Sequence, residues 1–224
     1  MLRIVLRLAD PAEWIEVFDP RDGTVFVASA APPALGTDVR IDLTCGDEGP
    51  RVILRGQVMG HRAGGQAGAD GDGADDDRRP GFLAALGPSE REKVNYLNGF
   101  VRGGLLDLRS HRRLPVRLPV TYGGIKGPCE SFTRDLNDQG AFVLTDEPLP
   151  EDAEVHLLVT LPGRPQPLSV VGVVSHTVVP EDEDVPGMGI VFRLSDAERA
   201  EVKAAVDALE KAFLACELPE DTLA

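Results

Sequence analysis

The chain has 224 residues, of which 42% are hydrophobic and 27% are charged, so it can form one large domain or two small ones with a packed core. Its formal net charge of −14 argues against broad, nonspecific binding to nucleic acids or anionic membranes, because both need a basic face. The first residues meet Asp10 and Pro11 too early for a signal peptide, and no apolar run approaches the ~18 residues of a membrane span.

The predicted elements of the first half are mostly short strands. β-Branched or alternating runs predict strands at 2–8, 39–43, 52–58 and 82–86, and residues 17–28 predict a turn that leads into a β-branched strand. The segment 64–81 is rich in Gly and Asp, so we expect a solvated loop there. Ser89 and Glu92 then fit a helix capping box, and Val94, Leu97 and Val101 follow on one helical face.

The second half repeats this order of elements. Residues 19–61 align without a gap to residues 116 positions later, with nine identical pairs. These pairs are Asp19/Asp135, Asp22/Asp138, Phe26/Phe142, Val27/Val143, Pro32/Pro148, Val39/Val155, Thr44/Thr160, Gly56/Gly172 and Val58/Val174. After the Gly/Asp loop the offset becomes 106, which aligns Ser89 with Ser195 and its own capping box to Glu198. The final helix then carries the apolar stripe Val202, Val206, Leu209 and Phe213.

The repeat predicts a mainly β protein of two small antiparallel β-barrels, each followed by a C-terminal α-helix. We expect the first domain at residues 1–104, with a boundary near Gly103 and Gly104, the second at 105–217, and a short tail at 218–224. The alternative is one β-rich domain whose halves are similar by accident.

Sites for metals or for catalysis are not indicated. Cys45, Cys129 and Cys216 lie far apart and form no CxxC or Cys/His cluster, so we expect a cytoplasmic protein without a metal site or cofactor. The sequence lacks a Walker loop, a G-x-S-x-G motif and a dinucleotide fingerprint, and it groups no nucleophile with a base, so we expect no enzyme activity.

The residues that could bind a ligand are concentrated at 109–145, a stretch that begins with a basic cluster in an otherwise acidic chain. Arg109, Arg112 and Arg113 lie close together, and guanidinium groups bind phosphate in a bidentate manner and stack on bases. Asp135 could accept hydrogen bonds from the N1–H and N2–H₂ edge of guanine, and Gly140 suits a tight turn. The alternative is that these arginines only solubilise a linker.

These residues resemble the PilZ domain, a bacterial receptor module for cyclic di-GMP. The stretch RSHRR at 109–113 matches the family's RxxxR motif, and LPVRLPVTY after it is typical of the first PilZ strand. The stretch DLNDQG at 135–140 matches the D/N-x-S-x-x-G motif, with Asn137 in place of Ser. The resemblance implies a split barrel in which Arg109 and Arg113, with Arg112 beside them, bind phosphates and base faces. Asp135 and Asn137 would hold guanine beside Gly140.

The first half departs from both motifs. Its stretch DPRDGT at 19–24 takes the place of the second motif, with Arg21 at the Ser position. Arg3 and Arg7 have RxxxR spacing but lie within a predicted strand, so we attribute that spacing to chance. We therefore expect a degenerate PilZ-like domain that lost ligand binding and serves packing or partner recognition.

The leading hypothesis is a cyclic di-GMP receptor that signals to a protein partner when ligand binding orders the RxxxR segment. The alternative is a ligand-independent PilZ-like adaptor or scaffold in motility, polarity or secretion. We expect no nucleic-acid partner and no membrane insertion, and a homodimer is left open.

Overall fold

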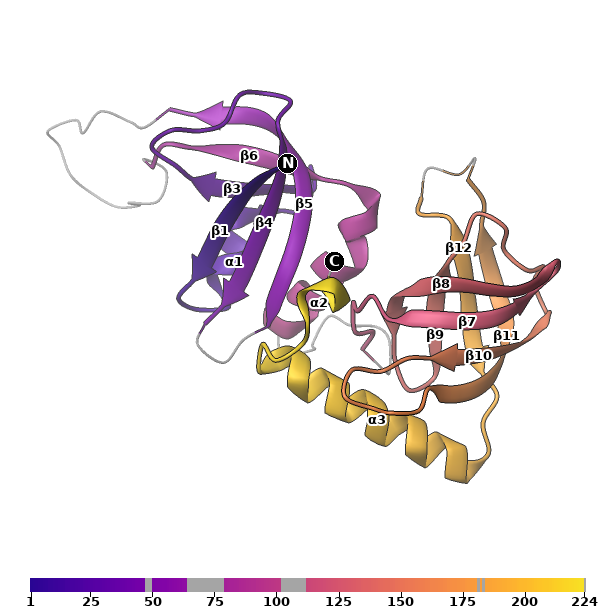
Figure 1. Cartoon of the computed structure of the whole chain (residues 1–224). Coiled ribbons are helices and arrows are strands. Elements are labelled where there is room, and N and C mark those ends of the chain that lie inside the picture. Colours follow the sequence, from indigo (N-terminus) through magenta and orange to yellow (C-terminus); the bar gives the residue numbers. More distant parts are fainter. Residues whose placement is uncertain (47–49, 64–78, 102–111, 181, 183, 224) are drawn as a thin grey trace, which may run out of the picture.

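The computed structural model describes residues 1–46, 50–63, 79–101, 112–180, 182 and 184–223. The first half, residues 1–101, contains a six-stranded sheet, and the second half, residues 112–223, contains a closed barrel of six strands (Figure 1). The predicted mainly β fold with a C-terminal helix is confirmed. The boundary predicted near Gly103 and Gly104 lies outside the described residues.

The first-half sheet has the strand order β1-β4-β5-β6-β3-β2. Its elements are β1 (Leu2–Leu8), α1 (Glu13–Val17), β2 (Phe18–Asp19), β3 (Thr24–Ala28), β4 (Asp38–Cys45), β5 (Arg51–Arg62), β6 (Gly81–Leu86), the 3-10 helix η2 (Pro88–Glu90) and α2 (Arg91–Val101). The single tryptophan, Trp14 on α1, is fully buried, stacks on Phe18 with ring centroids 4.9 Å apart, and donates a hydrogen bond to Asn98 on α2.

The second-half barrel closes in the order β10-β11-β12-β9-β8-β7. Its elements are β7 (Pro119–Gly124), β8 (Gly127–Leu136), β9 (Gly140–Leu144), β10 (Glu154–Val159), β11 (Leu168–Val178), β12 (Gly187–Phe192), α3 (Asp196–Leu214) and the 3-10 helix η3 (Glu220–Thr222). In β7, β10 and the first part of β11 alternate residues are buried, as the period-two pattern predicts, and their apolar side chains contribute to the core.

The repeat seen in the sequence extends to strand pairing. The order β4-β5-β6-β3-β2 corresponds to β10-β11-β12-β9-β8, and from β4 to β3 equivalent residues pair in the same register. For example, Val39 pairs with Gly56 as Val155 pairs with Gly172. Both copies also shift register at the same point of the fold, between Val58 and Gly60 and between Val174 and His176.

The first half corrects one expectation, because its sheet is open and contains a parallel pair. β1 occupies the place of β7 but runs parallel to β4, whereas β7 is antiparallel to β10. The reason lies in the connections. A tight hairpin between Gly124 and Gly127 joins β7 to β8 and makes them antiparallel neighbours, whereas α1 separates β1 from β2. β2 has only two residues and does not reach β1.

The two helices that follow the sheets begin in different ways. Ser195 forms the predicted capping box with Glu198, and the predicted stripe of α3 is buried. The capping box predicted at Ser89 is wrong, because Ser89 lies inside η2, which begins at Pro88, and α2 starts only at Arg91.

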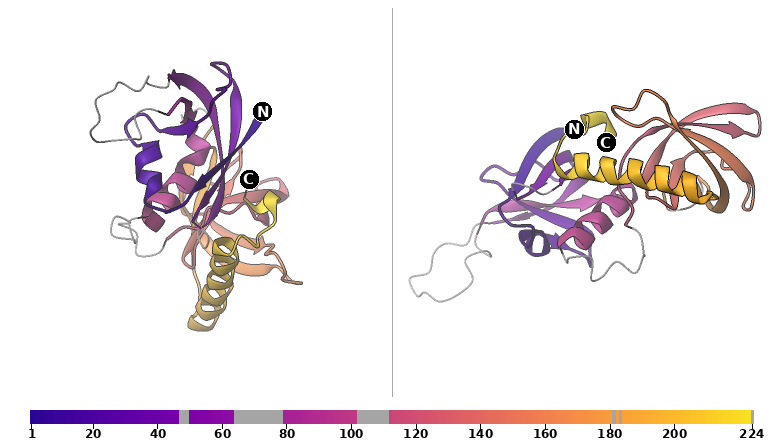
Figure 2. Two further views of the ribbon diagram at one scale, coloured as in Figure 1. Left: turned by 90° about the vertical axis from the view of Figure 1, so that its left-hand side faces the viewer. Right: turned by 90° about the horizontal axis from the view of Figure 1, so that it is seen from below.

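Packing between α2 and α3 joins the halves. Tyr96 on α2 meets Phe213 on α3 edge to face, with ring centroids 5.1 Å apart, and both rings are buried. In the views of Figures 1 and 2, α3 runs from the barrel back toward the first half, so η3 lies beside the first-half sheet. The buried apolar side chains consequently form one core that continues through both halves.

The segment after α3 is packed against both halves. Leu218 and Leu223 are buried, and the backbone N–H of Arg117 donates to the carbonyl of Thr222 at 2.8 Å. Glu220 forms an ion pair with Arg40 of β4. Within the described residues, none of the helices has the length and apolar character needed to cross a membrane.

Candidate functional site

The candidate site lies where the chain enters the barrel beside the end of β8. Leu114 and Leu136 exchange two backbone hydrogen bonds, of 2.8 and 3.0 Å, so the entering segment is held against this end of the strand. The bridge places Arg113 next to Asp135 although the two are 22 positions apart in the sequence. Arg109 lies outside the described residues.

Asp135 is the buried centre of the site. Its side chain is 0% exposed, and its two carboxylate oxygens accept hydrogen bonds from different arginines. Nη1 of Arg113 lies 3.0 Å from Oδ1, and Nε of Arg134 lies 2.9 Å from Oδ2. Burial raises the pKa of Asp135, and the charges of Arg134 and Arg113 oppose that rise. Arg113 of the RxxxR motif therefore meets Asp135 of the D-x-N-x-x-G motif.

Arg134 is a site residue that the sequence analysis missed. Besides holding Asp135, its guanidinium carbon lies 3.7 Å from the ring centroid of Phe142, and its Nη2 lies 3.9 Å from Oε1 of Glu92 on α2. Strict alternation would put Arg134 and Asp135 on opposite faces of β8. The register of β8 shifts between Thr133 and Asp135, and this irregularity lets neighbouring side chains meet. The sequence carries no signal for that shift.

Asn137 shapes the turn that follows β8. Its Oδ1 accepts hydrogen bonds from the backbone N–H groups of Gln139 and Gly140, both at 2.9 Å. A serine hydroxyl can cap a turn in the same way, though more weakly, so Asn137 supplies the acceptor that the family's Ser would supply. The departure from the motif therefore preserves the local backbone bonding.

Gly140 is required for a reason other than the predicted tight turn. A Cβ atom at Gly140 would lie 2.3 Å from the carbonyl oxygen of Ile190 on β12. The glycine thus allows β9 and β12 to approach closely beside the site.

Arg112 and Arg113 point to different partners. The guanidinium of Arg112 lies 5.8 Å from the ring centroid of Tyr96 on α2, whereas Arg113 reaches Asp135 on β8. Arg117, further along the same segment, stacks 3.4 Å above the ring of Phe132. A small cavity of about 80 Å³ between the halves is lined by Arg55, Ser89, Glu92, Lys93, Pro115, Arg117, Thr133, Arg134 and Leu144. The site is therefore in contact with α2 of the first half.

Strand pairing corrects the alignment of the second motif with the first half. On the β2 side the offset is 118, because Phe18 pairs with Val25 where Leu136 pairs with Ala141. The β3 side keeps the offset of 116, since Val25 and Ala141 pair with equivalent residues of β6 and β12. The first-half turn is accordingly two residues longer.

This correction changes which first-half residues correspond to the site. Asp19, and not Arg21, takes the place of Asn137, and its Oδ1 accepts the N–H of Arg21 at 2.8 Å, as Asn137 accepts that of Gln139. The position of Asp135 then falls on Val17, which has no carboxylate. The first half therefore keeps the capped turn and lacks the buried acid.

Among the described residues, no group of three or more His, Cys, Asp or Glu side chains is arranged to hold a metal ion.

Comparisons with known proteins relate the second half of the chain to a family. No curated protein sequence gives a significant match. Similar solved structures include the motility inhibitor MotI/DgrA of Bacillus subtilis, with a TM-score of 0.39, 9% identity, and coverage of 86% of this chain and 86% of that chain.

The PilZ domain of Escherichia coli YcgR, solved with c-di-GMP, is also similar, with a TM-score of 0.37, 15% identity, and coverage of 46% of this chain and 92% of that chain. The PilZ domain of CeSA from a cellulose-synthesizing bacterium has a TM-score of 0.35, 22% identity, and coverage of 44% of this chain and 97% of that chain. The sequence profile of the PilZ domain matches residues 107–208. Residues 107–208 of the chain are therefore a PilZ domain.

Proposed function

We propose that the second half binds cyclic di-GMP and acts as a receptor without enzyme activity. The observation that carries this proposal is the contact of Arg113 with the buried carboxylate of Asp135, which joins the two sequence motifs in one place. PilZ domains are a family of cyclic di-GMP receptors, so the same chemistry is expected of this one.

The ligand has two phosphates and two guanines. The site offers an arginine for a phosphate or a base face, and a carboxylate for the N–H edge of a guanine. Arg113, whose side chain is 26% exposed, is accessible to a phosphate or to the face of a base. If the ligand draws Arg113 away, Oδ1 of Asp135 becomes free to accept the N–H edge of guanine. Arg134 would stay on Oδ2 and keep the carboxylate in place. In this proposal Arg109 and Arg112 add further phosphate contacts, and Asn137 and Gly140 hold the turn.

A route to the rest of the molecule begins at Arg112. The guanidinium of Arg112 lies 5.8 Å from the ring centroid of Tyr96 on α2, so recruitment of Arg112 by a phosphate would change a contact between the halves. We propose that such a change is what a protein partner senses.

Calorimetry with cyclic di-GMP tests the proposal. We expect binding at or below ~100 μM ligand, a concentration that detects even weak association. Arg113→Ala should weaken binding at least several-fold, because it removes a charged, bidentate donor. Arg199→Ala, which removes the same charge from the exposed side of α3, should leave the affinity unchanged. An absence of heat and of competition at that concentration would refute ligand binding, and equal affinity of Arg113→Ala would refute the assigned site.

A ligand-independent adaptor remains the second candidate, in motility, polarity or secretion. The observation that favours it is that both oxygens of Asp135 are already hydrogen-bonded to arginines. An adaptor would bind its partner equally well with and without cyclic di-GMP, and an Arg109→Ala/Arg113→Ala variant would bind as the unaltered protein does. A receptor would lose the ligand dependence of partner binding in that variant.

A further inference from the structure

The first-half sheet has an opening between β1 and β3 that the second half does not have. In the barrel, β8 covers this side of β9, since Asp135 pairs with Phe142 and the hydroxyl of Ser131 donates to the carbonyl of Leu144. The corresponding strand of the first half, β2, pairs only with Thr24 and Val25. Beyond those two residues, the described part of the chain places no strand on this side of β3.

Backbone polar groups face this opening from both sides. Ser29 donates its N–H to the carbonyl of Pro80 at 2.9 Å. Hydrogen-bonded and non-bonded pairs alternate in an antiparallel ladder, so Phe26 and Ala28 direct their N–H and C=O groups away from β6. On β1 the carbonyl of Leu8 accepts the N–H of Gly46 at 2.8 Å, so Leu8 bonds to the β4 side. Every second residue of β1 bonds to β4 in this way, and the residues between them direct their N–H and C=O groups away from β4.

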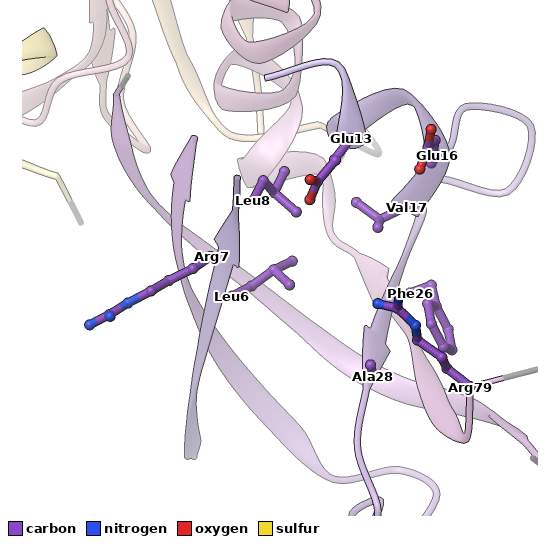
Figure 3. Close-up of a pocket in the computed structure, with 9 residues that line it drawn as sticks. All are labelled: Leu6, Arg7, Leu8, Glu13, Glu16, Val17, Phe26, Ala28 and Arg79. Carbon is purple, nitrogen blue, oxygen red and sulfur yellow. The ribbon is translucent and has the colours of Figure 1, made fainter. Parts of the chain in front are cut away.

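The opening holds a cavity of about 560 Å³. Its lining residues are Leu6, Arg7, Leu8, Glu13, Glu16, Val17, Phe26, Ala28 and Arg79. Figure 3 shows Leu6, Leu8 and Val17 turned toward the space between the strands, and Arg7 turned away from it. Within the described residues, these parts of β1 and β3 pair with no strand on the side of the opening. An apolar floor between two such strand edges is the combination that an added β-strand needs.

We propose that the opening binds an extended segment of a partner protein, added as a strand antiparallel to β3. The segment would complete the first-half sheet as β8 completes the barrel. Its main-chain groups would pair with Phe26 and Ala28, and alternate apolar side chains would enter the cavity.

The acidic side chains beside the opening indicate where the bound segment should carry a basic residue. Glu13 and Glu16 of α1 lie near Val17, at the end of the opening where β2 meets Val25. A strand antiparallel to β3 has its C-terminal end there, so we expect a basic side chain near that end. β8 has the same polarity in the second half, because Arg134 lies near its C-terminal end and approaches Glu92. This inference does not depend on cyclic di-GMP binding.

The first probe is a synthetic octapeptide with the β8 sequence of residues 129–136, carrying Cys129→Ser to prevent oxidation. Trp14 is the single tryptophan and lies on α1, which also carries the lining residues Glu13, Glu16 and Val17, so we use its fluorescence to report occupancy. We expect binding with a Kd of ~1 mM or tighter. The backbone amides of Phe26 and Ala28 should become protected from hydrogen exchange. The second probe is a display library of random octapeptides, whose selected members should protect the same two amides.

Two protein variants test the assignment. Ala28→Pro removes an N–H that faces the opening and leaves the bonding to β6 intact, so it should weaken binding at least tenfold. Glu16→Arg should weaken binding of the β8 peptide several-fold, and a peptide carrying Glu in place of its Arg should recover the loss. The charge-reversal pair keeps the test valid if Ala28→Pro does not fold.

Three results would overturn the proposal. One is that neither the β8 peptide nor any selected octapeptide protects Phe26 and Ala28. Another is that bound peptides protect β9 or another surface. The third is that these two amides become protected in the protein alone as its concentration rises, which would assign the opening to a second copy of the chain. Protection by either peptide probe, lost in the variants, supports the proposal.

Discussion

At the scale of single residues, Asn137 decides whether the second motif is intact. Its Oδ1 accepts hydrogen bonds from two backbone N–H groups, and the residue is 8% exposed. Asn137→Ala leaves these donors without that acceptor, and we expect it to lower the free energy of unfolding by about 1–3 kcal/mol. Asn137→Ser keeps an acceptor and should cost less than half as much. Urea unfolding measures both changes.

A matched control for this test is Asn95→Ala, which removes an exposed asparagine from α2 and should leave stability nearly unchanged. If Asn137→Ala were as stable as the unaltered protein, the turn would not depend on the side chain. If Asn137→Ser were as unstable as Asn137→Ala, the hydroxyl would be no substitute for the amide oxygen.

Single residues also show how far sequence reasoning reaches into the site. The spacing of Arg113, Asp135 and Gly140 was readable, because a motif records which residue types recur at fixed positions. The role of Arg134 could not be predicted, since it arises from a register shift in β8 that no residue in the sequence indicates. The reason for Gly140 was also beyond the sequence, because the carbonyl of Ile190 that excludes a Cβ belongs to a strand 50 positions away.

At the scale of elements, α2 and α3 have the same S-x-x-E pattern but different starts. Ser195 and Glu198 satisfy each other's backbone N–H groups, whereas Ser89 lies within η2 and caps nothing. Ser195→Ala should therefore lower the free energy of unfolding by about 1 kcal/mol. Ser89→Ala is the matched control and should change it by less than about 0.5 kcal/mol.

Urea unfolding of the two variants side by side distinguishes the starts. Equal losses would mean that Ser89 caps α2 in solution, and the order of the two elements η2 and α2 would have to be revised. Loss in neither variant would mean that packing of the α3 stripe alone determines the start of that helix.

The strands were predictable in position and less so in arrangement. β-Branched and alternating runs, together with the repeat, located β3 to β6 and β9 to β12. The direction of β1 was not predictable from its own residues. A run such as Leu2–Leu8 can pair either way, and the connection through α1 decides which. The register of the β2 turn was not predictable either. The sequence alignment made Asp19 equivalent to Asp135, whereas strand pairing makes it equivalent to Asn137.

At the scale of the whole molecule, the two halves are joined by more than the chain. Tyr96 packs on Phe213, and Glu92 approaches Arg134 beside Asp135. On the opposite side of the first-half sheet, Glu220 of η3 pairs with Arg40 of β4. The candidate ligand site and the C-terminal segment are thus each in contact with the first half.

Asp42 on β4 is the buried centre of that second contact and makes it sensitive to pH. Its side chain is 5% exposed and accepts hydrogen bonds from Arg40 and Arg3, both at 2.7 Å. Burial raises the pKa of Asp42, but the arginine hydrogen bonds outweigh burial, so the pKa lies below its usual value. The stability that Asp42 contributes is present above the unfolded-state pKa of about 3.9 and is lost as the pH falls through the lower folded-state pKa.

We therefore expect the free energy of unfolding to fall as the pH drops below about 5 and on through the lowered folded-state pKa, and Asp42→Asn to reduce that slope because it removes the titrating group. Asp38→Asn, which changes an exposed carboxyl on the same strand, should leave the slope as it is. Urea unfolding at a series of pH values measures the slope. Since Arg40 joins Asp42 to Glu220, hydrogen exchange of residues 218–223 should rise over the same interval. An unchanged slope in Asp42→Asn would mean that other carboxyls control the acid response.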